Sequence, residues 1–330
     1  MALVDAHGRV HDDLRLSVTD RCNLRCAYCM PEEPVWFPRA EILSFEEIVR
    51  IARIAIGEGV GKLRVTGGEP LLRRGVVGLI ARLAALPGVR DLSLTTNGVL
   101  LAPLAGDLAR AGLSRVNVSL DTLDRERFRR LTGRDRLDDV LRGLAAARDA
   151  GLAPIKINAV LMRGENEGEA VDLVRFGREN GYEVRFIEFM PLENDHSWEI
   201  GRVVTGASLR RRIADAWPIA RDPSGDPHAP ASRYLFEDGS GAVGFIDSVS
   251  APFCAACSRI RVASDGRFRV CLYDDRETDL RAALRGGETD EAIAAMMRAA
   301  LGRKGRGGAL DILESQAALP LARTMHQIGG

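Results

Sequence analysis

The 330-residue sequence has no surplus of either charge, because 46 lysines and arginines balance 46 aspartates and glutamates. A chain without a global positive field is poorly suited to bind nucleic acid or an anionic membrane surface. Any anion must therefore be held by a local cluster of cations. Lysine is itself scarce, with only Lys62, Lys156 and Lys304, so a lysine in an unusual place is informative.

Long apolar runs are missing as well. No stretch approaches the roughly 18 apolar residues that span a bilayer, and residues 1–7 lack the basic flank and apolar stretch of a signal peptide. We therefore expect a cytoplasmic protein. Thiols are kept reduced in that compartment, so the six cysteines are expected to be metal ligands rather than disulfide partners.

Three of these cysteines, Cys22, Cys26 and Cys29, fall within eight residues. Their C-x3-C-x2-C spacing offers three thiolates to one metal centre and no fourth, so the centre can bind something else. Ligation by cysteine alone favours a four-iron cluster. Zinc is the main alternative, although structural zinc prefers four ligands at paired spacings. A third possibility is that the three are core cysteines with no shared ligand.

A second triplet, Cys254, Cys257 and Cys271, again offers three ligands and is interpreted as a second four-iron cluster with its own open iron. The alternative pools both triplets into one zinc site. Arg259 and Arg261 follow directly and lie on the same side of an extended segment, where guanidinium groups suit phosphate oxygens. Exposed strand arginines are the plainer interpretation of this pair.

Short β-branched runs alternate with helical patterns along the first 190 residues. The runs cover residues 14–19, 62–66, 91–96, 115–120, 154–161 and 183–190, and the candidate helices cover 45–56 behind the cap Ser44, 76–85, 101–111, 137–150 and 167–180. The alternation predicts an α/β fold with a parallel sheet, and a partial (β/α)6 TIM-type barrel fits better than a flat sheet because polar residues follow every strand. We expect the barrel to occupy residues 1–220 and a C-terminal module to occupy 221–330, with an exposed loop at 221–230.

Polar residues at the carboxyl ends of the predicted strands are candidates for one shared site, since barrel enzymes place their chemistry there. They include Thr19, residues 66–70, residues 95–98, Ser119 with Asp121, Asn158 and residues 188–191. Each one alone is equally compatible with a turn or a helix cap. Cations accompany them: Lys156 interrupts an apolar strand, so it either reaches outward to solvent or meets an anion inside. Together, Arg15, Arg64, Lys156, Arg259 and Arg261 predict a polyanionic small molecule such as a nucleoside triphosphate.

The first cysteine loop resembles the C-x3-C-x-aromatic-C loop of the radical S-adenosylmethionine (SAM) superfamily, with Tyr28 as the aromatic residue. The resemblance implies that the open iron binds the amino and carboxylate groups of SAM and that the reduced cluster splits SAM to a 5′-deoxyadenosyl radical. Residues 67–70 are similar to the GGEP motif of that superfamily. By the same resemblance Tyr28, Gly68, Ser119 and Met190 are SAM contacts.

The two triplets, the Arg-Ile-Arg segment and the terminal R-x-M-x-x-I-G-G pattern together resemble the GTP 3′,8-cyclase family of molybdenum cofactor biosynthesis. This implies hydrogen abstraction from the ribose C3′ of GTP and attack of C3′ on guanine C8, with the guanine at the open iron of the second cluster. The implied GTP contacts are Arg15, Arg64, Thr95, Lys156, Arg259, Ile260 and Arg261. The terminal Gly329 and Gly330, which in an arbitrary protein suggest a frayed end, are implied to reach the active site.

The same family resemblance implies a set of partners. GTP is the substrate, a protein of the flavodoxin or ferredoxin type donates electrons, and cyclic pyranopterin monophosphate synthase acts next; the chain is a monomer or homodimer. Two rivals stay open: a radical SAM peptide-modifying enzyme with auxiliary clusters, and a non-catalytic zinc or iron-sulfur binding protein. Metal content separates them, because two four-iron clusters require about eight irons per chain.

Overall fold

The computed structural model describes residues 2–31, 33–192, 198–315 and 322–329. Its strands are β1 (Asp13–Ser17), β2 (Lys62–Thr66), β3 (Asp91–Thr96), β4 (Arg115–Ser119), β5 (Lys156–Leu161), β6 (Glu183–Glu188), β7 (Ile219–Arg221), β8 (Ser232–Phe236), β9 (Ala242–Ile246), β10 (Arg259–Val262), β11 (Arg267–Arg269) and β12 (Thr278–Asp279). Its α-helices are α1 (Phe45–Gly57), α2 (Val76–Ala84), α3 (Ala105–Arg110), α4 (Arg125–Thr132), α5 (Leu137–Asp149), α6 (Ala170–Asn180), α7 (Gly206–Ala216), α8 (Leu280–Arg285), α9 (Asp290–Gly302), α10 (Gly308–Ser315) and α11 (Met325–Ile328).

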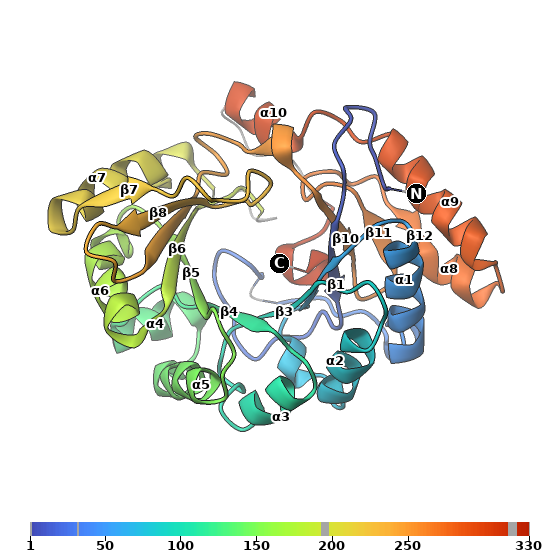
Figure 1. Cartoon of the computed structure of the whole chain (residues 1–330), viewed down its shortest axis with the longest axis horizontal. Coiled ribbons are helices and arrows are strands. Elements are labelled where there is room, and N and C mark those ends of the chain that lie inside the picture. The colour runs from blue at the N-terminus through green and yellow to red at the C-terminus, as the bar shows by residue number, and fades with distance from the viewer. Residues whose placement is uncertain (1, 32, 193–197, 316–321, 330) are drawn as a thin grey trace.

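All these strands form one curved sheet in the order β12-β11-β10-β1-β2-β3-β4-β5-β6-β9-β8-β7. The stretch from β10 through β1–β6 to β9 is parallel, and antiparallel strands flank it on both sides. Helices lie outside the curve, and the chain approaches its C-terminus inside it (Figure 1). The described sheet is not closed, so the predicted partial barrel is confirmed. Its parallel arc is longer than predicted, because β9 and β10 extend it at either end.

The strands separate an apolar outer face from a polar inner face by simple alternation. Leu14, Leu16 and Val65 are at most 1% exposed and pack toward the helices. Their neighbours Arg15 and Arg64 point inward. In the strand register Arg15 lies beside Arg64 on β2 and beside Arg261 on β10, so three arginines from adjacent strands form one row inside the barrel.

Helix α1 begins where the sequence predicts, because Ser44 and Glu47 form a capping box. The Ser44 hydroxyl accepts a hydrogen bond from the Glu47 N–H at 3.1 Å, and the Glu47 carboxylate accepts one from the Ser44 N–H at 2.7 Å. Helix α4 was not predicted. It is rich in arginine and buries only Phe128, Leu131 and Thr132, so its apolar pattern is too sparse to detect.

Some boundaries differ from the prediction. The strand predicted at 154–161 begins at Lys156, and the helix predicted at 101–111 is shortened to Ala105–Arg110. The expected division between residues 220 and 221 falls within β7, and strands on both sides of it belong to the same sheet. None of the helices in the described ranges has the length and apolar character needed to cross a membrane.

Candidate active site

The first cysteine triplet lies in the loop after β1, at the carboxyl ends of the parallel strands. Cys22, Cys26 and Cys29 are half-buried free thiols. Burial raises the pKa of all three, that of Cys29 to about 12, and neighbouring thiols raise the pKa of Cys26 and Cys29 further. Thiols in such surroundings ionise when a metal cation coordinates them. The loop is therefore suited to a metal centre and not to a free thiolate.

The Gly67-Gly68 turn packs against the main chain at the start of this loop. A Cβ atom on Gly68 would lie 2.4 Å from the carbonyl oxygen of Arg21 and one on Gly67 would lie 2.6 Å from that of Thr19, so only glycine permits the approach. The next residue, Glu69, is fully buried and accepts hydrogen bonds from the Leu71 and Asn97 N–H groups and the Thr96 hydroxyl at 2.7–2.9 Å. Burial raises the pKa of Glu69 to about 7 even though these bonds oppose the shift.

The second triplet lies at the opposite end of β1. Cys254 and Cys257 precede β10, whose Arg259 pairs with Asp13 at the start of β1. Cys271 follows β11, which runs antiparallel to β10 and returns to the same end. The alternative in which both triplets share one zinc ion is therefore wrong.

No three His, Cys, Asp or Glu side chains in the described ranges converge on one point as the ligands of a single metal ion do. A cluster does not need that convergence, because each of its thiolates binds a different iron. The thiols of each triplet are nevertheless close enough to raise the pKa of their neighbours, Cys26 in the first set and Cys254 in the second.

Positive charge surrounds the second triplet. Burial by itself would raise the pKa of Cys257, but Arg259 and Lys304 lower it to about 6. The guanidinium of Arg259 lies 3.6 Å from the Cys257 sulfur and 4.4 Å from the centre of the Phe253 ring. Cys257 is thus available as a thiolate ligand at neutral pH.

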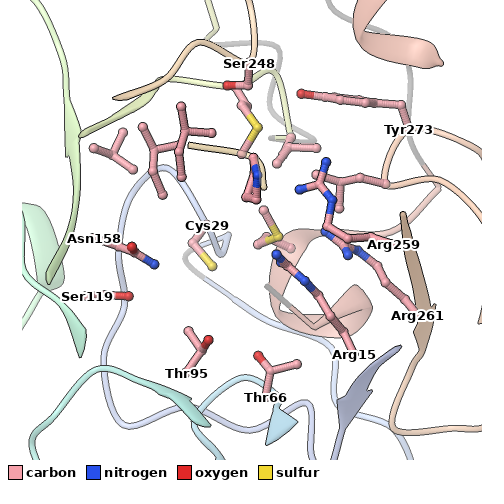
Figure 2. A pocket seen from close by; sticks show the side chains of 18 of the residues that line it. Arg15, Cys29, Thr66, Thr95, Ser119, Asn158, Ser248, Arg259, Arg261 and Tyr273 are labelled. Atoms are coloured by element: carbon pink, nitrogen blue, oxygen red, sulfur yellow. The ribbon is translucent and has the colours of Figure 1, made fainter. Parts of the chain in front are cut away.

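One cavity connects the two ends, and all six cysteines line it. Figure 2 shows Arg15, Arg259 and Arg261 entering the cavity from one side, with Ser119 and Asn158 on the other. The lining also includes Tyr28, Arg64, Gly68, Thr95 and Met190. Ile260 is fully buried in the core on β10 and does not line the cavity.

The arginine row inside the cavity has few partners. The Nε atoms of Arg15, Arg64 and Arg261 are buried and have no hydrogen-bond acceptor within the described residues. Burial and then neighbouring arginines lower the pKa of Arg15 and of Arg261, the latter to about 10, and Asp13 offsets part of the charge. Burying unpaired guanidinium groups costs free energy, which an anion bound in the cavity offsets.

Lys156 lies on the same face of β5 as Asn158, at the amino end of the strand. Its ammonium is 3.6 Å from the Glu183 carboxylate, and it does not line the cavity, to which β5 contributes Asn158 and Val160. Burial lowers the pKa of Lys156 to about 8, and the charge of Arg185 contributes.

Sequence reasoning missed Arg185, which lines the cavity from β6. Its guanidinium donates hydrogen bonds to the side-chain oxygens of Asn117 at 2.6 Å and Asn158 at 3.2 Å. The alternation that marks Lys156 also marks Arg185, which stands between the buried Val184 and Phe186 and points to the opposite face of β6. The missed Tyr273 comes from a loop for which no periodicity exists; its buried hydroxyl has no partner in the described chain.

The end of the chain enters the cavity. Met325 and His326 of α11 line it, and the preceding Arg323 is anchored by ion pairs to Asp265 at 2.8 Å and Glu277 at 2.9 Å. Gly329 has φ +85° and packs so closely that an added Cβ would lie 2.7 Å from the Cβ of Ser17. Gly330 lies outside the described residues.

Two family models match the chain. The model described as "Radical SAM superfamily" matches residues 16–177, and the one described as "Molybdenum Cofactor Synthesis C" matches residues 182–309. The first match runs from within β1 into α6 and includes the first triplet, and the second covers β6 to α9 and includes the second triplet.

Curated relatives match over nearly their full length. The GTP 3′,8-cyclase of Streptomyces coelicolor is 49% identical across 99% of this chain and 96% of its own, and that of Rhodopirellula baltica is 45% identical across 100% and 92%. Among solved structures, Streptococcus suis SuiB bound to its precursor peptide SuiA aligns with a TM-score of 0.64 over 98% of this chain and 77% of SuiB, at 16% identity. That likeness concerns the fold alone.

Proposed function

The chain belongs to the GTP 3′,8-cyclase family of radical SAM enzymes, and from this membership we propose how its two cysteine triplets and its cations divide the work. The reaction converts GTP to 3′,8-cyclo-7,8-dihydroguanosine triphosphate, in the first step of molybdenum cofactor biosynthesis. The observation that carries this conclusion is the 49% identity to a curated GTP 3′,8-cyclase across 99% of the chain.

Cys22, Cys26 and Cys29 are proposed to hold the four-iron cluster that the radical SAM family requires. When bound, cluster and SAM together supply the 5′-deoxyadenosyl radical. The three thiols fit such a group, since they are mutually close and half-buried, and no fourth metal ligand accompanies them among the described residues. Tyr28, Gly68, Ser119 and Met190 are proposed to hold SAM; all four line the cavity beside this triplet.

Cys254, Cys257 and Cys271 are proposed to hold a second four-iron cluster, whose open iron meets the guanine base. Support comes from the location of these thiols in the same cavity as the first triplet and from the positive charge around Cys257. A peptide-modifying enzyme of the same superfamily is the rival, but the 16% identity to SuiB gives it no support beyond the fold.

Seven residues are proposed to bind GTP: Arg15, Arg64, Thr95, Lys156, Arg259, Ile260 and Arg261. The arginine row supports binding of the triphosphate, because the Nε atoms of its three guanidinium groups are buried and lack acceptors in the described chain. Binding energy from the phosphates then positions the ribose, which is remote from them. Gly329 and Gly330 are proposed as catalytic tail residues, and the tight seat of Gly329 against Ser17 supports a fixed position.

The remaining assignments follow from the family and are proposals. A flavodoxin or ferredoxin type protein donates the electron, cyclic pyranopterin monophosphate synthase takes the product, and the enzyme acts in the cytoplasm as a monomer or homodimer. Residues 1–220 form the radical-generating part, and residues 221–330 carry the second cluster and the tail.

Anaerobic reconstitution tests the cluster assignments. The chain should bind about eight irons, and replacing Cys254, Cys257 and Cys271 by alanine should leave about four. Incubation of the reduced protein with SAM and GTP deuterated at C3′ tests the chemistry. Deuterium in 5′-deoxyadenosine together with a cyclised product supports the proposal, whereas its absence in fully loaded protein contradicts the abstraction site.

A further inference from the structure

A series of buried polar side chains, each in contact with the next, links the N-terminal segment to Cys257, which is more than 240 residues away in the sequence. The ammonium of Lys304 lies 3.9 Å from the Cys257 sulfur, 3.4 Å from the Arg259 carbonyl oxygen and 3.4 Å from Nδ1 of His11. Nε2 of His11 lies 3.0 Å from the Asp5 carboxylate. Asp5, His11 and Lys304 are all at most 6% exposed.

Lys304 has no carboxylate within ion-pair distance among the described residues, although it is only 3% exposed. A lysine ammonium has three donors, and its three neighbours here account for all of them. A buried cation of this kind is costly unless an anion compensates it. The candidate anion in contact with Lys304 is the Cys257 sulfur.

His11 determines which groups donate and which accept in this series of hydrogen bonds. Burial and then the charge of Lys304 lower the pKa of His11 to about 4, so the ring is neutral at pH 7. A neutral ring that donates its Nε2–H to Asp5 has Nδ1 free to accept a hydrogen bond from Lys304. Asp5 thereby orients His11, and His11 orients the ammonium of Lys304 toward the sulfur.

The turn that carries Lys304 is fixed against the second triplet. Arg9 donates hydrogen bonds to the carbonyl oxygens of Cys254 at 2.8 Å and of Gly305 and Arg306 at 2.7 Å. Gly307 packs directly on the same cysteine, since an added Cβ would lie 2.5 Å from the Cys254 sulfur. The ammonium therefore approaches Cys257 from a rigid support.

We propose that Lys304 is a positioning residue for the second iron-sulfur cluster, donating a hydrogen bond to the Cys257 thiolate and compensating its charge, with Asp5 and His11 orienting it. The inference rests on the proposed function, because it presupposes that the second triplet holds a cluster. Partners of this kind around metal ligands contribute about 10- to 100-fold to metal affinity. A fixed positive charge beside the cluster also favours its reduced state.

The test uses a parent variant in which Cys22, Cys26 and Cys29 are replaced by alanine, so that only the second cluster is assembled. Lys304→Met in this parent should still bind about four irons, lose them to a ferrous chelator about tenfold faster, and have a more negative midpoint potential in an EPR-monitored redox titration. His11→Gln should shift both quantities in the same direction by less. Lys304→Arg, which keeps the charge, should retain the midpoint potential of the parent.

Arg298→Met is the matched control, because it removes one positive charge from the preceding helix α9 at a partly exposed side chain paired with Glu58 and Glu291. It should leave both quantities unchanged. If Lys304→Met and the parent lose iron to the chelator at equal rates and have equal midpoint potentials, the role of Lys304 is overturned while the second cluster stands. A parent that binds no iron would instead overturn the second cluster, and the role of Lys304 with it.

Discussion

The phenol of Tyr28 donates a hydrogen bond to the carboxylate of Asp121 across 2.6 Å. Tyr28 stands between the second and third cysteines of the first triplet, and Asp121 follows β4. The other Asp121 oxygen accepts a hydrogen bond from the Val160 N–H at 2.8 Å. Burial raises the pKa of Asp121 to about 6 even though both bonds favour the carboxylate. The bond thus connects the cysteine loop to the inner strand ends that line the cavity.

Tyr28→Phe should weaken this connection. The variant leaves one buried Asp121 oxygen without a donor, which costs about 1–3 kcal/mol of unfolding free energy. We expect lower stability in denaturant titrations and several-fold weaker SAM binding by equilibrium dialysis, with the iron content unchanged. Tyr234→Phe on β8 is the control. Unchanged SAM affinity in Tyr28→Phe would show that the tyrosine does not help to hold the SAM site.

GTP affinity should depend on pH through Lys156. Burial lowers the pKa of Lys156 to about 8 in the free protein, and a bound triphosphate favours the protonated ammonium. The dissociation constant should therefore rise above pH 8, by at most tenfold per pH unit. Lys156→Arg stays protonated and should flatten the profile measured by calorimetry between pH 7 and 9. The same slope in both proteins would assign the effect to another group.

The lowered pKa also affects folding. The folded value of about 8 lies below the ordinary value of 10.5, so the unfolded chain binds more protons between these two pH values. The contribution of Lys156 to stability should therefore be least favourable below pH 8 and improve as the pH rises toward 10.5. Comparing Lys156→Met with the unaltered protein in denaturant titrations at pH 7 and 10 measures this difference.

Arg261→Ala should weaken GTP binding and turnover at least tenfold, because losing one buried charge contact costs about 2–5 kcal/mol. Assembly of the first cluster should be unchanged. The thermal midpoint should not fall, since the substitution relieves repulsion within the arginine row. Arg267→Ala on the adjacent β11, whose guanidinium pairs with Asp279 at 3.1 Å, is the control. Normal GTP turnover in Arg261→Ala would refute the assigned role.

Gly329→Ala should lower turnover while GTP and SAM still bind. An alanine at φ +85° is strained, and its Cβ would lie 2.7 Å from that of Ser17, so the tail must shift. Ser17→Gly removes the opposing atom. The double variant should therefore recover part of the activity in a product assay by chromatography. No recovery would attribute the loss to backbone strain alone.

The strand pattern was predictable because it is local. Residues 62–66 and 91–96 were predicted as strands, and β2 and β3 have these bounds. Period-two alternation likewise predicted that Arg259 and Arg261 share one face, and both line the cavity. Local pattern could not predict the extension of the arc by β9 and β10, since pairing with β6 and β1 joins segments far apart in the chain.

The loop at 221–230 shows the same limit. It is mostly exposed, as predicted, but Asp226 pairs with Lys62 on β2 at 3.3 Å, and Nδ1 of His228 lies 3.2 Å from the Ala256 carbonyl oxygen. Pro230 lines the cavity. Turn-forming composition predicts only that a segment leaves the regular structure. It cannot predict which parts of the fold the segment contacts, because those contacts are made with residues far away in the sequence.

Strand β1 lies between the two cysteine triplets and has a fixed length. Its five residues rise by about 3.3 Å each, so roughly 16 Å of rigid, hydrogen-bonded backbone runs from the strand end near the second cysteine triplet to the end that leads into the first. Only an elongated molecule can touch both ends at once. Inserting a single residue into β1 would lengthen this distance and also turn Arg15 toward the helices, because one step along a strand exchanges its two faces. The five residues of β1 therefore set both the length of the strand between the two triplets and the position of the Arg15 charge in the cavity.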